Sequence, residues 1–218
     1  MPLTSPRTIA ALLSMTFVTG LIDAASVLGL GHVFVANMTG NIVFIGFSLF
    51  THTSVSLGAG ALALTAFFVG AVFGGRFMTQ RGQRGPHAAL LLEVGLFFVA
   101  GALAAQFHGL RSLLLIAPLA FAMGMRNAVI RALGIPDLTT TVLTLTVTGI
   151  AADSSLAGGN NPRLARRLMS IAAMLTGAAL GALLFARAPA YVLLVAAVLE
   201  ACAALSLVQS LAPNPKQP

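Results

Sequence analysis

Charged side chains are scarce in this chain. Only 8% of its 218 residues are charged, 12 of them Lys or Arg and 5 Asp or Glu, whereas soluble domains average roughly 25%. Hydrophobic residues make up 58% of the chain and its mean hydropathy is +0.97. So few polar groups cannot cover the core of a soluble fold, so lipid must surround most of the chain. This excludes a separate soluble catalytic or nucleic-acid-binding module.

Groups that bind metals or perform catalysis are also scarce. Cys202 is the one cysteine and lies in an apolar run, so neither a disulfide framework nor a cysteine metal site is expected. The four histidines lack metal-ligand spacing, and we expect no metal and no cofactor. No P-loop, nucleophile elbow or zinc signature occurs, so we expect no enzymatic activity. An intramembrane enzyme stays an alternative without a recognisable catalytic constellation.

Apolar segments predict an all-α polytopic membrane bundle with six or seven crossings and two irregular or broken helical segments. A spanning helix needs roughly 20 residues. The sixth segment has only 15 residues, which reach about 22 Å as a helix, against a hydrocarbon core of about 30 Å. The second segment carries Asn37, Thr39, Gly40 and Asn41 in its middle. The eight segments cover residues 9–31, 33–50, 56–78, 87–107, 112–131, 138–152, 164–186 and 189–210.

The positions of the basic residues predict which loops face the cytoplasm. If the sixth segment enters the membrane and returns, the arginines at 76–84 and 163–167 share one side with Arg131 and Lys216. The positive-inside rule makes that side cytoplasmic, whereas eight crossings would separate the two arginine clusters. The C-terminus is then cytoplasmic. The side of Arg7, and with it the choice between six and seven crossings, stays open.

Recurring residues predict an internal duplication within a single membrane domain, 1–218. The predicted halves are 9–107 and 112–210, followed by a short polar tail, 211–218. Three crossings per half would place the halves in opposite orientations, as in many secondary transporters. The Gly-xxx-Gly pairs favour packing within the chain, so an oligomer is possible but not predicted. The recurrences are Gly70 and Gly74 as Gly177 and Gly181, Glu93 as Glu200, and Asp23-Ala24 as Asn127-Ala128.

Four ionisable residues fall inside apolar segments, where each costs about 2.5 to 3.5 kcal/mol on insertion scales. Glu93 lies one turn into the fourth segment and Arg126 one turn before the end of the fifth. Antiparallel helices would bring them to one depth, so we expect an intramembrane charge pair. Glu200 has no evident partner and is expected to be a buried acid that is protonated or faces a polar cavity. Asp23 either coordinates a cation or proton, or locks helix packing.

The two irregular segments supply the candidate binding site. Gly40 and its polar neighbours are typical of a discontinuous helix. Pro136 and Asp137 predict the start of the sixth segment, whose alternating threonines either belong to partly extended chain or bond back to their own helix. A transporter or channel-like permease for a small solute or ion is expected, with a structural or accessory protein as the alternative. The candidate binding residues are Asp23, Asn37, Thr39, Asn41, Asn127, Thr141 and Thr144.

Two stretches carry a family resemblance: GLIDAASVLGLGHVFVANMTGNIVFIG (20–46) and AMGMRNAVIRALGIPDLTTTVLTLTVTGIAADS (122–154). Their Asp-Ala, Thr-Gly-Asn and threonine-rich blocks resemble the YoaK-like family of small bacterial multi-pass membrane proteins. The resemblance implies a multi-pass protein of the bacterial cytoplasmic (inner) membrane. It implies no catalytic residue or substrate. From the composition we expect the lipid bilayer as its partner and no nucleic acid.

Overall fold

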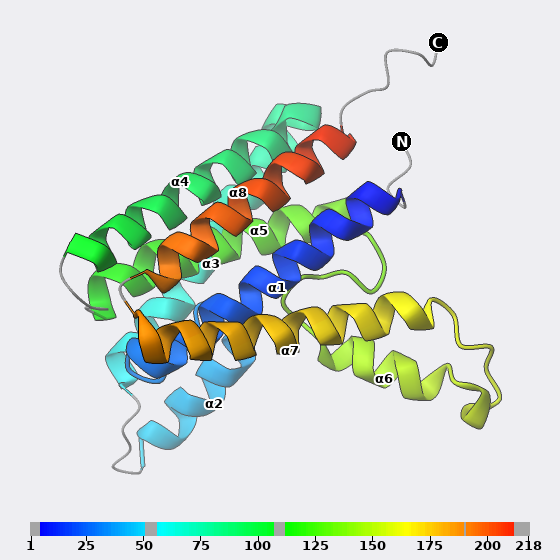
Figure 1. Cartoon of the computed structure of the whole chain (residues 1–218), viewed down its shortest axis with the longest axis horizontal. Coiled ribbons are helices and arrows are strands. Elements are labelled where there is room, and N and C mark those ends of the chain that lie inside the picture. Colours follow the sequence, from blue (N-terminus) through cyan, green and yellow to red (C-terminus); the bar gives the residue numbers. More distant parts are fainter. Residues whose placement is uncertain (1–4, 51–55, 107–111, 190, 212–218) are drawn as a thin grey trace.

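The chain folds into a bundle of long helices with two short ones beside it (Figure 1). The computed structural model describes residues 5–50, 56–106, 112–189 and 191–211, and within these ranges it contains helices and no strand. The predicted all-α membrane bundle is confirmed. The α-helices are α1 (Pro6–Gly29), α2 (Met38–Ser48), α3 (Leu57–Arg81), α4 (Gly85–Gln106), α5 (Ser112–Leu133), α6 (Thr144–Ala152), α7 (Leu164–Arg187) and α8 (Val192–Leu211).

Six of these helices are long and apolar enough to cross a membrane: α1, α3, α4, α5, α7 and α8. The remaining two are too short, since α2 has 11 residues and α6 has nine. At 1.5 Å per residue neither reaches across a hydrocarbon core of about 30 Å. Helix length therefore favours the lower of the two expected numbers of crossings. The predicted tail lies outside the described residues from position 212 onward.

Glycines allow two pairs of helices to pack backbone against backbone. A Cβ atom at Gly70 or Gly74 of α3 would overlap the carbonyl oxygen of Phe121 or Met125 of α5. The same arrangement recurs between α7 and α1, where Gly177 and Gly181 lie against other backbone carbonyls. Removing the side chain is what permits such a close approach. The carbonyls facing the second glycine pair are those of Phe17 and Leu21.

These contacts also set the helix directions. Phe17 and Leu21 meet Gly177 and Gly181 in the same order, so α1 and α7 run parallel, and α3 and α5 do likewise. By contrast, α4 and α8 run antiparallel, because Gly101 contacts Leu194 while Glu93 and Glu200 meet farther along. The termini of the described chain therefore share one end of the bundle, as Figure 1 shows.

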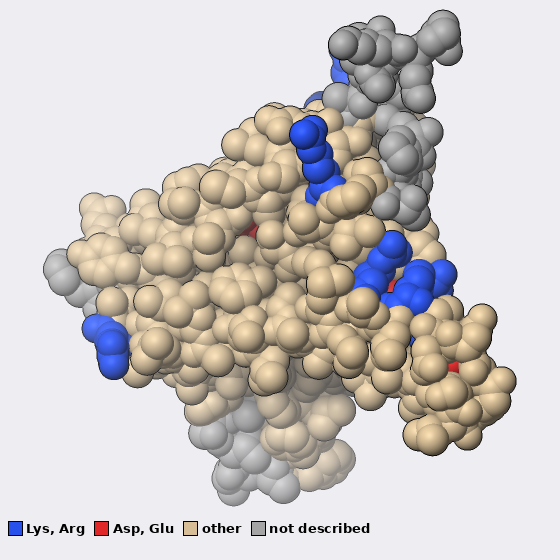
Figure 2. Space-filling view, turned by 45° about the vertical axis from the view of Figure 1, so that its right-hand side comes forward, with Lys and Arg blue, Asp and Glu red and all other residues tan. Residues whose placement is uncertain are grey.

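Basic side chains concentrate at the end of the bundle that holds these termini. In Figure 2 most of the blue side chains gather towards the right, with little blue at the left. Arg187, at the end of α7, belongs to the opposite end. Arg111 and Lys216 lie outside the described residues. The arginines at the terminal end are Arg7, Arg76, Arg81, Arg84, Arg131, Arg163, Arg166 and Arg167.

The predicted start of the sixth segment at Pro136 and Asp137 is wrong. Residues 134–143 form turns and bends without regular secondary structure, with Asp137 at φ 63°, and α6 begins only at Thr144. Asp137 does not cap a helix; its carboxylate binds Arg163 at 2.6 Å and Arg167 at 3.1 Å. Two ion pairs from the start of α7 thus outweigh the local capping preference.

Arg167 joins the two ends of this irregular segment. Its Nη2 lies 2.8 Å from Asp153 Oδ2, and its Nη1 donates to the carbonyl of Gly149 at 2.6 Å. Partial burial raises the pKa of Asp137, but the hydrogen bonds from Arg163 and Arg167 outweigh it and hold this pKa below its ordinary value. One guanidinium on α7 thus binds the chain before α6, through Asp137, and the C-terminal end of α6, through Gly149 and Asp153.

We expect Gly70→Ala or Gly177→Ala to lower the free energy of unfolding by about 1 to 3 kcal/mol, because backbone atoms cannot yield to the added methyl group. Gly75→Ala is the matched control, since nothing lies within 4 Å of its Cβ position, and its effect should stay within about 0.5 kcal/mol. Unfolding of the purified variants in detergent measures both. Equal stability of Gly70→Ala and Gly75→Ala would contradict the close crossing.

Asp137→Asn should destabilise the α6–α7 region at neutral pH, because it removes the charge that both arginines bind. Folding lowers the pKa of Asp137 below its ordinary value of 3.8. Its contribution to the free energy of unfolding is therefore complete above pH 3.8 and is lost as the pH falls through the lower folded pKa. Melting temperatures of wild type and variant should differ at neutral pH, begin to converge as the pH falls below 3.8, and coincide below the folded pKa. A difference that persists unchanged in acid would show that Asp137 acts through its shape and not its charge.

Candidate functional site

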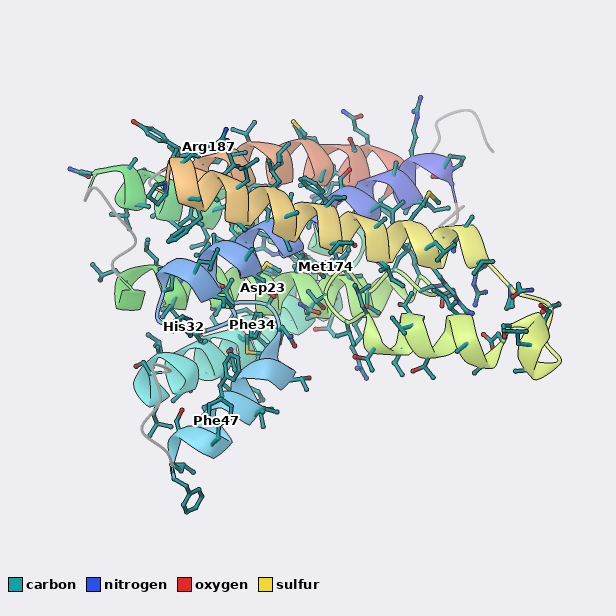
Figure 3. The ribbon with its side chains drawn as sticks, turned by 60° about the horizontal axis from the view of Figure 1, so that its bottom comes forward. Asp23, His32, Phe34, Phe47, Met174 and Arg187 are labelled. Carbon is teal, nitrogen blue, oxygen red and sulfur yellow. The ribbon has the colours of Figure 1, made fainter. Side chains whose placement is uncertain are left out.

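The first turns of α2 and α6 meet at one cavity beside α1 and α7. The cavity has a volume of about 980 Å³. Asp23 of α1 lines it together with the beginnings of both short helices, and Met174 of α7 and Phe67 of α3 complete the wall. Figure 3 shows Asp23 and Phe34 near each other, with Met174 on the helix alongside. Two segments more than a hundred residues apart in sequence thus form a single site.

Asp23 holds the chain that leads into α2. Its Oδ1 accepts hydrogen bonds from the backbone N–H groups of Val35 at 3.1 Å and Ala36 at 2.9 Å. The residue is only 9% exposed. Asp23 therefore organises this loop and places a carboxyl group at the cavity wall.

Two asparagines stabilise the start of α2. Asn41 is fully buried and pairs with the backbone of Phe34 in both directions, accepting from its N–H at 2.9 Å and donating to its carbonyl at 2.6 Å. Asn37 is the N-cap, and its Oδ1 accepts from the N–H of Gly40 at 3.4 Å. Residues 37–41 therefore form the start of α2, preceded by a turn. The two amides bind backbone groups that a continuous helix would otherwise have paired.

An equivalent arrangement precedes α6. Asn127, 104 positions after Asp23, accepts a hydrogen bond at its Oδ1 from Thr141 Oγ1 at 2.5 Å. Its Nδ2 donates to the carbonyl of Met123 at 2.9 Å. Thr141 itself lies 104 positions after Asn37. A neutral amide thus performs in the second half of the chain the anchoring that a carboxylate performs in the first.

The seven candidate binding residues separate into two groups. Five of them line the cavity, whereas Asn41 and Asn127 anchor loops behind it. The alternating threonines at 144, 146 and 148 all lie in the helix α6, and Thr148 Oγ1 donates to the carbonyl of Thr144 at 2.9 Å, as expected for a hydroxyl that bonds back to its own helix. Only the threonines before α6, at 139–141, are not helical. The cavity-lining five are Asp23, Asn37, Thr39, Thr141 and Thr144.

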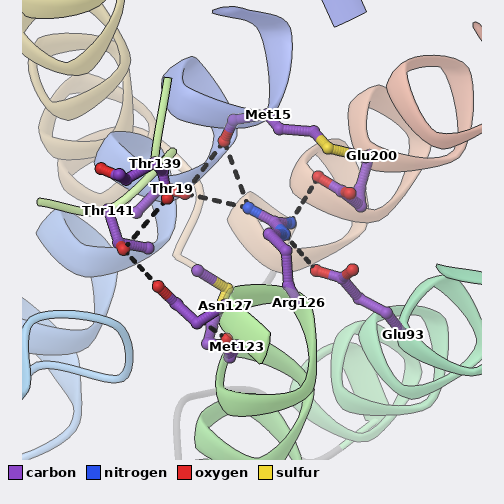
Figure 4. A network of polar contacts seen from close by, with 9 residues as sticks. All are labelled: Met15, Thr19, Glu93, Met123, Arg126, Asn127, Thr139, Thr141 and Glu200. Carbon is purple, nitrogen blue, oxygen red and sulfur yellow. Dashed lines mark hydrogen bonds and ion pairs between the residues drawn. The ribbon is translucent and has the colours of Figure 1, made fainter. Parts of the chain in front are cut away.

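An arginine–glutamate cluster lies in the middle of the bundle (Figure 4). It consists of Arg126 of α5, Glu93 of α4 and Glu200 of α8, all fully buried. Arg126 Nε donates to Glu93 Oε1 at 2.5 Å, and Arg126 Nη2 lies 2.6 Å from Glu200 Oε2. The structure thus brings Glu93 and Arg126 together, and it gives Glu200 the partner that sequence reasoning did not find.

The remaining guanidinium nitrogen of Arg126 binds α1. Its Nη1 donates to Thr19 Oγ1 at 2.9 Å and to the carbonyl of Met15 at 3.2 Å. Four helices therefore meet at one side chain. Thr19 and Met15 were missed by sequence reasoning, because a hydroxyl bonding back to its own helix, as Thr19 does to Met15, is common in membrane helices and does not mark a site.

Comparison with known proteins identifies the family of this chain. A family described as "Protein of unknown function (DUF1275)" matches residues 11–206. The UPF0700 transmembrane protein YoaK of Bacillus subtilis (strain 168) is 32% identical over 153 residues, which are 68% of this chain and 67% of that protein. No solved structure matches. Since the family match spans nearly all of the described helices, the chain belongs to the DUF1275 family of YoaK-like multi-pass membrane proteins.

Proposed function

We propose that this membrane protein is a transporter or channel-like permease, and that the cavity between α2 and α6 binds a small solute or ion. The observation that carries the proposal is that five polar residues from α1 and the two interrupted segments line one cavity. Interrupted helices at mid-membrane depth occur where the freed backbone groups line a binding site. No enzymatic step is part of this proposal.

The proposed architecture is an inverted repeat. Helices α1, α3 and α4 of the first half correspond to α5, α7 and α8 of the second, and six alternating crossings give the two sets opposite directions. Gly70 against Phe121 has its counterpart in Gly177 against Phe17. The interrupted segments then enter from opposite faces of the membrane. Many secondary transporters use this symmetry to open a central site to either side.

The proposed orientation places both termini in the cytoplasm, with the protein in the bacterial inner membrane. The support is the concentration of arginines at the terminal end of the bundle, whereas Arg187 lies at the other end. Cytoplasmic ends of membrane helices are enriched in Lys and Arg.

The cavity offers hydrogen-bond donors as well as hydroxyl groups. The first turns of α2 and α6 carry the positive ends of their helix dipoles. In α6 the N-cap residue, Leu143, has no side chain that can bond the first N–H groups. An acceptor atom of a solute can occupy that place, while Asp23 supplies negative charge across from it.

A structural or accessory role is the second candidate, and one observation favours it. The bonds of Asp23, Asn41 and Asn127 to their neighbouring loops are those of residues that hold a fold together. Under this alternative the polar residues seal a hydrogen-bonded network, and the cavity is filled by lipid chains.

Cysteine labelling distinguishes these two functions. In a Cys202→Ser background, Thr39→Cys and Thr141→Cys should react with a membrane-impermeant thiol reagent, because both positions line the cavity. Ala36→Cys is the matched control, being only 4% exposed and next to the cavity wall. Protection of Thr39→Cys and Thr141→Cys to the level of Ala36→Cys would mean a dry network and would contradict the permease.

Asp23→Asn should abolish solute flux without destabilising the fold. An asparagine keeps an oxygen that can accept from Val35 and Ala36, so only the charge is lost. Asp23→Ala removes these bonds as well and should cost about 1 to 3 kcal/mol. Stopped-flow swelling of proteoliposomes with a panel of inorganic anions, carboxylates, amino acids and sugars measures flux. Flux through Asp23→Asn equal to that of wild type would remove Asp23 from the mechanism.

A further inference from the structure

The arginine–glutamate cluster carries an excess of acid. Arg126 supplies one positive charge, whereas Glu93 and Glu200 supply two negative charges when both are ionised. All three side chains are at most 1% exposed. An uncompensated charge in the hydrocarbon interior is costly. The cluster is therefore neutral only if something positive joins it.

Two carboxylate oxygens in the cluster have no hydrogen-bond partner. They are Glu93 Oε2 and Glu200 Oε1. A third, Glu200 Oε2, also makes no hydrogen bond but lies 2.6 Å from Arg126 Nη2 in an ion pair. Arg126 Nη1 is already engaged by Thr19 and Met15. A buried carboxylate oxygen without a donor costs free energy unless it acquires a hydrogen.

Other charges near the cluster do not supply the missing positive charge. Asp23, on the neighbouring helix α1, is an acid and brings no positive charge. The remaining charged or titratable groups on the helices packed around the cluster lie towards helix ends. They are Arg7 of α1, Arg76 and Arg81 of α3, His87 of α4, Arg131 of α5, and Arg166, Arg167 and Arg187 of α7. The exception is Cys202, in the middle of α8, whose exposed thiol supplies no positive charge.

We propose that the arginine–glutamate cluster binds one exchangeable proton, carried on the free oxygens of Glu93 and Glu200. The proton comes from a hydronium ion: an O–H bond forms on one glutamate and one O–H bond of the hydronium breaks, leaving water. Release reverses this step. With the proton bound the cluster holds one carboxylate, one carboxylic acid and one guanidinium, and is neutral.

A metal cation fits the cluster less well than a proton. A hard cation needs about six oxygen ligands, whereas the cluster offers two free carboxylate oxygens beside a guanidinium that repels it. No group of three or more acidic, His or Cys side chains that could hold a metal occurs among residues 5–50, 56–106, 112–189 and 191–211. A proton needs a single oxygen and no added space.

The cluster is connected to the cavity through two neighbouring side chains. Arg126 donates to Thr19, one turn before Asp23 on α1. Arg126 is also adjacent in sequence to Asn127, which binds Thr141 at the cavity wall. Coupling of the proton to solute movement rests on the proposed function, but proton binding itself does not. The test therefore uses protein without any solute.

The composition of the chain permits a direct test, because Glu93 and Glu200 are its only glutamates. Wild-type protein labelled with glutamate that carries ¹³C in its side-chain carboxyl group is reconstituted in lipid bilayers. Infrared difference spectra between alkaline and neutral buffer then report these two groups alone. We expect a labelled carboxylic acid C=O band at neutral pH that shifts in D₂O and disappears on alkalinisation.

Variants locate the proton. Glu93→Gln and Glu200→Gln each leave a neutral Arg–Glu pair, so each should fold and lose the labelled acid band. Gly75→Ala, which alters no group of the cluster, is the control and should keep it. Loss of the band in only one glutamine variant still supports the proton site and assigns the proton to that glutamate.

Two results would overturn the proton site. One is a wild-type spectrum that shows only ionised glutamate at neutral pH. This result is independent of whether the variants fold. The other is an acid band that survives in both glutamine variants. A proton site found together with absent solute flux would keep this inference and reject the permease, so the two failures are distinguishable.

Discussion

The guanidinium of Arg126 is the interaction on which the bundle depends. It joins α5 to α4 and α8 through two carboxylates and to α1 through Thr19 and Met15. A single planar group with five donors can bind several partners at once, which an ammonium ion cannot do with the same geometry. In a lipid environment these bonds cannot be replaced by water. The positions of four helices are thereby specified by one side chain.

Glycine crossings provide the second constraint, and they act between helices that are distant in sequence. Because α3 packs on α5, and α7 on α1, each half of the chain is completed by the other. The cavity follows from this arrangement, since α2 and α6 are left beside the crossings with their first turns facing each other. The site is thus a consequence of how the halves interlock.

Much of the fold could be predicted from composition and segment length. Scarcity of charge predicts the membrane bundle, and the short threonine-rich segment predicts a helix that does not cross. Polar residues in apolar segments also predict the polar part of the cavity lining, including Asp23 and Thr141. Such residues are informative because lipid makes each of them costly.

Tertiary contacts between distant residues could not be predicted in the same way. Glu200 meets Arg126 because α8 packs against α4, and no local pattern in 192–211 reports that neighbour. Asp137 was assigned to a helix start because Pro-Asp is common there. Its actual partners, Arg163 and Arg167, lie after α6 in the sequence, and their ion pairs override the local preference.

The interlocked crossings have a consequence for biosynthesis. If helices enter the membrane in chain order, the glycine face of α3 contacts lipid until α5 has been made. Arg126 enters with α5 but meets Glu200 only when α8, the last helix, arrives. The arginine–glutamate cluster is therefore complete only after α8 has been made, because Glu200 is one of its two carboxylates.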